Sequence, residues 1–432
     1  MTTLHAGDAL TVLKTLPSES VQCAITSPPY LGLRDYGVTG QVGLEDTPEA
    51  HLEALVGLFR EMRRVLRPDG TFWLNYGDCY WGGKGKSGYE LPHEAEARRK
   101  TGATIQRAHN VPGYRDMRPT DAKHAMYKPK DLCLMPFRLA LALQQDGWLL
   151  RSCCPWVKRN PLPESAKDRP SSAVEYIFLL SKRPTYFYDG EAVRVPNTEA
   201  GIKRAACPSG NGDARYGGAF HDHSDDAVKG RRIDHPAIHP AGRNRRNSDW
   251  FFESWQGMDT DEDGNPLAFV VNPMPTKLAH FATFPPKLVE PMVKAGTSEK
   301  GCCSECGAPW RRVVANHVPV LGVDIPEATR HKNQGASSAH SKTSAIRVSH
   351  SGNWSKFKAE HPTETLRWEP SCPHDAPVKP CVVLDPFAGA GATLLVADRL
   401  GRDGVGIELN PDYLAMARER LRADSPLFAE VS

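Results

Sequence analysis

Long apolar runs, a leader pattern and a strong charge bias are all missing from this sequence. No apolar run approaches the ~20 residues that a membrane-spanning helix needs. The segment Met1–Asp8 lacks the pattern of a signal peptide. Lys and Arg number 54 against 51 Asp and Glu, so any affinity for nucleic acid must come from local basic patches. We therefore expect a cytoplasmic protein with no membrane segment.

A disulfide framework and tandem repeats are also missing. The 11 cysteines lie in a long chain without a signal peptide, which fits a reducing compartment better than disulfide bonding. The length of 432 residues exceeds that of one ordinary domain. A catalytic α/β domain of about 250 residues with one or two insertions is expected from this length.

A rigid polar turn follows the first clear strand. The apolar run Val21–Ile25 is typical of a buried strand, and Ser27, Pro28, Pro29 and Tyr30 come directly after it. Two prolines fix two backbone dihedrals and remove two N–H donors. Ser27 Oγ and the Pro28 carbonyl are then suited to accept hydrogen bonds from a planar, amino-bearing group, while Tyr30 stacks on its face. The alternative is a proline-rich turn without chemistry.

A glycine-rich turn near the other end of the chain argues against that alternative. The predicted strand Cys381–Leu384 leads into this turn, and a helical pattern follows it from Leu394 to Leu400. The candidate ligand-binding residues of the turn are Asp385, Pro386, Phe387, Gly389, Gly391 and Thr393. The next strand, Gly404–Ile407, ends in Glu408, which is placed to bind ribose hydroxyls. Strand, turn and helix in this order predict a nucleotide-binding unit of a doubly wound α/β sheet.

Together these two motifs resemble those of the β-group, permuted amino DNA methyltransferases of the Ser-Pro-Pro-Tyr type. In that family the catalytic motif precedes the cofactor motif, as it does here. The resemblance implies a Rossmann-like sheet, S-adenosylmethionine as cofactor and double-stranded DNA as partner. Family members with Ser first mostly modify cytosine N4, and those with Asp first mostly modify adenine N6.

This resemblance favours a sequence-specific cytosine-N4 methyltransferase that acts on a flipped base. Its setting would be restriction–modification or the protection of phage or bacterial DNA. Adenine-N6 methylation is the alternative, and an RNA or protein amine methyltransferase is a remote one. A non-enzymatic DNA-binding module would not need both motifs. Cytosine-C5 methylation needs a Pro-Cys nucleophile, but Pro380-Cys381 precedes the cofactor strand, which is the wrong place.

The resemblance also implies further cofactor contacts. Thr283, Phe284 and Pro285 match the segment that holds the methionine end of the cofactor. Asp8 matches an acid that lies near the cofactor adenine in the family, although an acid at a helix N-terminus is nearly as good an interpretation. In a segment that lines the base pocket in relatives, Trp156 and Asn160 are candidates, with Trp156 better explained as core.

The domain organisation is expected to have five parts. These are a catalytic half at 1–188 with a mobile loop at 81–130, a target-recognition region at 189–271, a cofactor segment at 272–300, a zinc knuckle with a basic insertion at 301–380, and a cofactor-binding half at 381–432. The candidate DNA contacts are Lys84, Lys86, Arg243, Arg245 and Arg246, with solvated charged surface as the alternative. A homodimer and a cognate restriction endonuclease are left open as further partners.

A cysteine and histidine pattern predicts a metal site. Cys303 and Cys306 form a Cys-x-x-Cys knuckle, and Cys372 with His374 supplies two more ligands. Three thiolates and one imidazole suit a tetrahedral structural zinc site. The alternative is four ordinary reduced residues.

Local patterns predict the elements around the catalytic turn. Leu52–Leu66 has helical spacing, Pro68-Asp69-Gly70 is expected to stop that helix, and Thr71–Asn75 is expected to be a strand. Further along the chain, the pattern predicts a helix at Phe137–Gln145 and strands at Trp148–Trp156 and Val174–Leu180.

Overall fold

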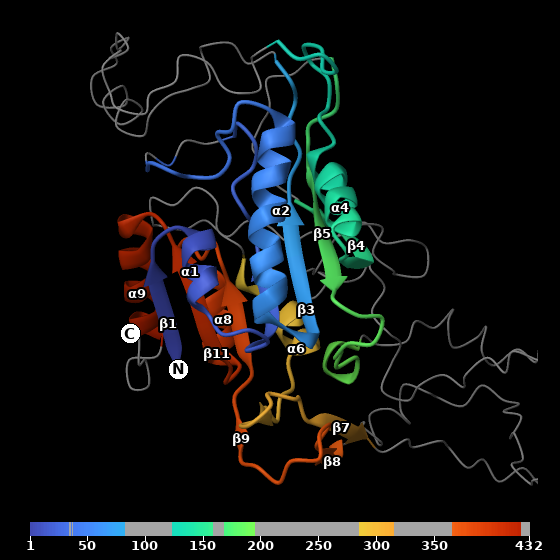
Figure 1. The fold of residues 1–432 in the computed structure, drawn as a ribbon, viewed down its shortest axis with the longest axis vertical. Coiled ribbons are helices and arrows are strands. Elements are labelled where there is room, and N and C mark those ends of the chain that lie inside the picture. The colour runs from blue at the N-terminus through green and yellow to red at the C-terminus, as the bar shows by residue number, and fades with distance from the viewer. Residues whose placement is uncertain are drawn as a thin grey trace, which may run out of the picture.

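A seven-stranded sheet forms the centre of the computed structural model, which describes residues 1–33, 36, 38–82, 123–158, 168–194, 285–314 and 365–424 (Figure 1). In spatial order the strands are β1 (Thr2–Ala6), β11 (Asp403–Glu408), β10 (Val382–Asp385), β2 (Val21–Thr26), β3 (Leu66–Tyr76), β5 (Val174–Ser181) and β4 (Leu149–Val157). The first five strands are parallel, and β5 runs antiparallel to both of its neighbours. The predicted parallel-rich α/β class is therefore confirmed.

Helices cover both faces of the sheet. One face carries α1 (Ala9–Thr15), α2 (Pro48–Val65) and α4 (Met135–Gln145), and the other carries α6 (Pro286–Gly296) and α8 (Ala392–Arg399). The residues of β2 divide between the two cores, with Val21 and Ala24 on the first face and Cys23 and Ile25 on the second. The strand is irregular between Val21 and Cys23, so these two residues lie on opposite faces. Helices on both faces explain why every residue of β2 is buried.

A third small core lies under α9 (Pro411–Asp424), whose Leu414, Ala417 and Leu421 pack against Leu4 and Leu394. Asn410 caps the start of this helix, since its Oδ1 accepts a hydrogen bond from the Asp412 amide at 2.9 Å. Among the described residues, no helix is both long enough and apolar enough to cross a membrane.

The chain leaves β2 and β10 toward opposite faces, because α2 and α8 lie on different sides of the sheet. These two strands are parallel neighbours, with Val383 beside Cys23 and Leu384 beside Ala24. In open α/β sheets a divergence of this kind leaves a crevice at the carboxyl ends of the two strands. The predicted catalytic and cofactor motifs both begin at that edge.

One expectation for the first half of the chain was wrong, and one strand was missed. The helix ends at Val65, before Pro68-Asp69-Gly70, and those residues lie inside β3, which starts at Leu66. The backbone amide of Leu66 caps the helix on Met62 O, and Leu66 pairs at once with Val21, so the chain needs no separate turn. The edge strand β1 was not predicted, because five residues with two threonines give little apolar signal.

Two small antiparallel sheets, each of two strands, form the knuckle region. They are β6 (Cys302–Cys303) with β9 (Val378–Lys379), and β7 (Arg311–Val314) with β8 (Thr365–Glu369). Figure 1 shows β7, β8 and β9 beyond the end of the main sheet at which the N-terminus lies. The parallel strands begin at this end. The knuckle region and the predicted catalytic turn therefore lie at opposite ends of the strands.

Candidate active site and metal centre

Asp385 joins the glycine-rich turn that follows it to β2, the strand that leads into the predicted catalytic turn Ser27–Tyr30. Its Oδ1 accepts hydrogen bonds from Thr26 Oγ1 at 2.7 Å and from the Phe387 amide at 3.1 Å, and its Oδ2 accepts one from Thr393 Oγ1 at 2.7 Å. The side chain is only 2% exposed, and this burial raises the pKa of Asp385 to about 6. The two motifs, 359 positions apart in sequence, are thus joined by one carboxylate.

The glycine-rich turn has the backbone that its sequence requires. Gly389 and Gly391 have φ angles of 52° and 74°, in the left-handed region that glycine adopts without strain. Glu408 Oε2 accepts a hydrogen bond from the Gly389 amide, and its Oε1 accepts one from the Asn410 amide, both at 2.8 Å. Burial raises the pKa of Glu408. Glu408, the acid predicted to bind ribose, therefore lies beside the glycine-rich turn and is held there by hydrogen bonds from backbone amides.

The other predicted cofactor residues are less closely joined. Asp8 is the N-cap of α1, where its Oδ1 accepts hydrogen bonds from the Thr11 amide and hydroxyl at 2.8 and 2.7 Å. The helix-terminus interpretation is thus confirmed for the described contacts. Pro285 is the N-cap residue of α6, while Thr283 and Phe284 lie outside the described residues.

A hydrogen-bonded group of five side chains surrounds the catalytic turn. The Tyr30 hydroxyl donates to Glu175 Oε2 at 2.8 Å and lies 3.1 Å from Ser27 Oγ. Asn75 Nδ2 donates to the Tyr30 oxygen and to Glu175 Oε2, each at 2.8 Å. Lys158 Nζ forms an ion pair with Glu175 Oε1. Burial, followed by the negative charge of Glu175, raises the pKa of Tyr30 well above its usual value, so its phenol keeps its proton.

Sequence reasoning did not find Asn75, Lys158 or Glu175. Glu175 stands at the start of β5, and the antiparallel direction of β5 brings it to the edge where β2 and β3 end. The available signal was a carboxylate within a strand that is otherwise apolar, since such a residue is rarely buried without a partner. Trp156 pairs in register with Glu175, is 4% exposed and belongs to the core. This agrees with the interpretation preferred from the sequence, which was a core residue and not a contact of the base.

Three further side chains, Tyr76, His51 and Glu45, form a chain of contacts next to Tyr30. The ring of Tyr76 lies 4.7 Å from that of Tyr30, and its hydroxyl oxygen accepts a hydrogen bond from the Leu31 amide at 3.2 Å. Buried His51 has Nε2 2.7 Å from the Tyr76 hydroxyl and Nδ1 2.7 Å from Glu45 Oε2. Although burial alone raises it, the pKa of Glu45 is lowered overall by its hydrogen bond with His51. This chain fixes one side of Tyr30 against the end of β3.

The predicted metal ligands come together in space. One ligand atom from each of Cys303, Cys306, Cys372 and His374 lies within 4.8 Å of the others, and Cys303 Sγ is 3.9 Å from His374 Nδ1. The backbone of Cys306 is the largest cause that lowers the pKa of Cys303 to about 7. Three thiols and one imidazole this close together suit zinc, which binds such sets at metal–sulfur distances of about 2.3 Å.

The cysteine–histidine cluster lies against the start of β2. Gln22 Nε2 donates to Gly307 O at 3.0 Å, and Gln22 Oε1 accepts from the Val382 amide at 2.7 Å. Arg67 Nη1 donates to Cys306 O. The cluster therefore contacts the opposite end of the strand from Ser27.

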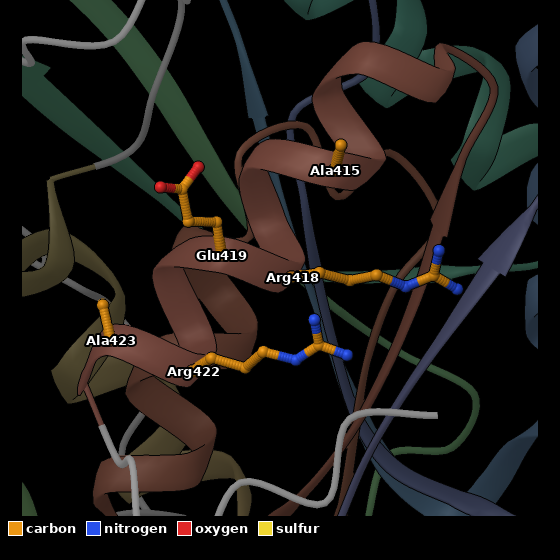
Figure 2. Close-up of a pocket in the computed structure, with 5 residues that line it drawn as sticks. All are labelled: Ala415, Arg418, Glu419, Arg422 and Ala423. Carbon is orange, nitrogen blue, oxygen red and sulfur yellow. The ribbon is translucent and has the colours of Figure 1, made fainter.

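The candidate DNA contacts Lys84, Lys86, Arg243, Arg245 and Arg246 lie outside the described residues, as does Asn160. A separate open pocket lies on α9, lined by Ala415, Arg418, Glu419, Arg422 and Ala423 (Figure 2). Arg418 and Arg422 run side by side there, while Glu419 points the other way. None of the candidate site residues lines this pocket.

Comparison with known proteins places the chain in a family. A family model described as DNA methylase, of the N6/N4 type, matches residues 21–304 and 379–419. The type II methyltransferase M.XycI of Xanthomonas campestris pv. cyanopsidis is 33% identical over 98% of this chain and 88% of its own length. M.Cfr9I of Citrobacter freundii is 32% identical over the same shares.

Solved structures also align with this chain. One of them is the PvuII DNA methyltransferase, described as cytosine-N4-specific, which covers 100% of this chain and 89% of its own at 14% identity and a TM-score of 0.46. A likeness this remote carries no argument about the target base. From the family match and the two full-length relatives, the chain belongs to the N6/N4 family of DNA methylases and is a relative of type II DNA methyltransferases.

Proposed function

We propose that this protein transfers a methyl group from S-adenosylmethionine to the N4 amine of a flipped cytosine in a specific DNA sequence. The observation that carries the choice of base is Ser27, which begins the Pro-Pro-Tyr turn at the end of β2. In the resembling family a serine at this position accompanies cytosine more often than adenine. Adenine N6 is the alternative target.

S-adenosylmethionine, when bound, supplies an electrophilic methyl group on a sulfonium centre. The glycine turn at Gly389 and Gly391, with Asp385, Pro386, Phe387 and Thr393 around it, is proposed to hold this cofactor, and Glu408 to bind its ribose. Thr283, Phe284, Pro285 and Asp8 are proposed as further contacts. The hydrogen bonds through Asp385 support this assignment, because they bring the turn against the end of β2.

The target amine is a poor nucleophile, because its lone pair is delocalised into the ring. Ser27 Oγ and the Pro28 carbonyl are proposed to accept its two N–H bonds, which concentrates electron density on nitrogen. Tyr30 is proposed to stack on the base, and Pro29 to keep the turn rigid. Catalysis then comes from positioning and electrostatics, without a covalent enzyme–base adduct.

Isotope-labelled S-adenosylmethionine tests the proposal directly. Double-stranded DNA is treated with the protein, digested to nucleosides and analysed by mass spectrometry after chromatographic separation. Label in N4-methylcytosine is the expected result. Label in N6-methyladenine would overturn the choice of base and keep the cofactor and the catalytic turn. Cofactor binding with no label in DNA would overturn the DNA substrate itself.

The proposed DNA contacts are Lys84 and Lys86 in the predicted loop and Arg243, Arg245 and Arg246 in the predicted recognition region. They are assigned by residue type and by their position in the resembling family. Alanine at each lysine should weaken binding to all DNA sequences and reduce its salt dependence. Alanine at an arginine that reads a base should instead relax the sequence preference.

We also infer that Cys303, Cys306, Cys372 and His374 hold a structural zinc ion. The clustering of their ligand atoms within 4.8 Å supports this, and so does the absence of any of them from the catalytic edge. The test is the metal content of the purified protein. One equivalent of zinc is expected, and replacement of Cys306 by Ser should remove it, whereas Ser at Cys153, outside the cluster, should not.

A further inference from the structure

The chemistry proposed for Ser27 requires its hydroxyl to accept a hydrogen bond, yet a hydroxyl can equally donate one. A serine that points its hydrogen at the target amine would face another donor and would repel it. Some neighbouring group must therefore fix the direction of the Ser27 hydrogen. The hydrogen bonds around Ser27 and Tyr30 show which group does so, provided that the proposed amine methylation is correct.

Counting hydrogens assigns the hydroxyl donors in this group. Asn75 Nδ2 lies 2.8 Å from both the Tyr30 oxygen and Glu175 Oε2, and because these two acceptors are themselves 2.8 Å apart, one amide hydrogen is shared between them. Ser27 Oγ, at 3.4 Å from Asn75 Nδ2, is the weaker acceptor left for the other amide hydrogen. The Tyr30 hydroxyl has one hydrogen, which goes to the carboxylate of Glu175 at 2.8 Å. A carboxylate accepts only, so this direction cannot reverse while Glu175 is ionised.

One hydrogen is then left to place, and it belongs to Ser27. The Tyr30 oxygen has a second lone pair, 3.1 Å from Ser27 Oγ, and has no further hydrogen of its own to offer. The Ser27 hydroxyl therefore donates to Tyr30. Among these side chains, only the long contact from Asn75 Nδ2 then donates to Ser27 Oγ. At least one Ser27 lone pair is therefore available to the N–H bond of a target amine.

We propose that Glu175 is a positioning residue that makes Ser27 an acceptor by orienting the Tyr30 hydroxyl. Its Oε1 forms an ion pair with Lys158 Nζ, which leaves Oε2 to accept from Tyr30 and Asn75. Glu175 also fixes Asn75, because a flipped amide would put its oxygen against the carboxylate. Glu175 need not touch the base, since it acts through Tyr30 and Ser27.

The replacement Glu175→Gln tests the direction of the hydrogen bonds while keeping the side chain's size. Lys158 would hold the glutamine carbonyl, which turns the NH₂ group toward Tyr30 and Asn75. The Tyr30 hydroxyl then donates to Ser27 and turns the Ser27 hydrogen toward the base. We expect kcat for methyl transfer to fall about 10- to 100-fold, as for the loss of other oriented active-site hydrogen bonds. The dissociation constant for S-adenosylmethionine should change less than about twofold, since no cofactor residue is touched.

A double-mutant cycle with Tyr30→Phe shows whether the effect passes through the Tyr30 hydroxyl. Tyr30→Phe alone should also lower kcat, and adding Glu175→Gln to it should cost less than about a further threefold. The matched control is Glu61→Gln, which removes a carboxylate from an ion pair with Arg64 on α2. This control should leave kcat unchanged.

Three outcomes would overturn the inference. The first is an unchanged kcat in Glu175→Gln. The second is a double variant in which the fold losses of the two single replacements multiply. The third is a Glu175→Gln protein that loses cofactor affinity and melting temperature together with kcat, which indicates a structural role. A wild-type protein that methylates no DNA amine would sink both this inference and the proposed function. An active wild type with an unaffected Glu175→Gln sinks this inference alone.

Discussion

Gly77, directly after β3, leaves room for the ring of Tyr30 and the carboxylate of Glu175. A Cβ atom there would lie 2.6 Å from Tyr30 Cε2 and 3.3 Å from Glu175 Cδ, so the ring would have to move. We expect Gly77→Ala to lower kcat at least about 10-fold and the free energy of unfolding by about 1–3 kcal/mol. Gly57→Ala is the control, since nothing lies within 4 Å of its added Cβ. Wild-type turnover in Gly77→Ala would contradict the packing described for Tyr30.

Asp385 predicts a particular pH dependence of stability. Its pKa rises from 3.8 to about 6 on folding, so between these values the folded state binds a proton that the unfolded state has lost. Its contribution to the free energy of unfolding is therefore largest in acid and is lost as the pH rises through 6. Between pH 5 and 7.5 the loss is about 1.4 kcal/mol. Urea unfolding at both pH values should show this slope in the wild type and not in Asp385→Asn. Equal slopes in the two proteins would refute the assignment.

At the scale of elements, the knuckle and the catalytic turn are attached to opposite ends of β2. Gln22 contacts the knuckle, and Ser27 follows the last residue of the strand, roughly 15 Å further on at about 3.3 Å per residue. Metal loss should therefore reduce stability without altering the chemistry. We expect Cys306→Ser to lower the melting temperature by roughly 5–10 °C while kcat at 20 °C stays within about twofold of the wild type. A large fall in kcat at unchanged melting temperature would show instead that the metal acts on the catalytic edge.

The sequence predicted those parts of the candidate site that depend on contiguous residues. Ser27 to Tyr30 and the turn after Asp385 are each one short segment, and the four candidate metal ligands come from two. The structure puts the two turns at strand ends and the four side chains in a compact cluster. Parallel pairing of β2 with β10 then brings the two motifs together. The predicted elements were mostly correct within two residues, except that α2 begins at Pro48, before Leu52, and β3 begins at Leu66, before Thr71.

The remainder depends on strand direction and order, which local patterns do not encode. Glu175 reaches the site only because β5 is antiparallel and lies beside β3. Had β5 run parallel to β3, the same residue would lie at the knuckle end of the sheet. The roles proposed for Asp8 and Glu408 remain predictions, since the described hydrogen bonds of both are to the protein itself.

At the scale of the whole molecule, both ends of the chain contribute to one sheet. β1 and β2 come from the first 26 residues, and in the sheet β11 and β10 lie between them. A fragment of residues 1–194 would leave one edge of β2 without its partner and β1 without β11. We expect this fragment to aggregate, as unpaired strand edges do, and sedimentation beside the full chain is the measurement. A monomeric, folded fragment would show that the first half is an independent unit.

The pairing of β2 with β10 also has a consequence for biosynthesis. Gln22 and Val382, which are hydrogen-bonded at the centre of the sheet, are separated by 360 positions. At about 5–20 residues per second, a ribosome takes roughly 20–70 seconds to supply the second after the first. Throughout that interval the nascent chain carries an open strand edge, and its protection falls to chaperones rather than to the protein's own fold. The central sheet, and the crevice between β2 and β10, can therefore form only after β10 has been translated.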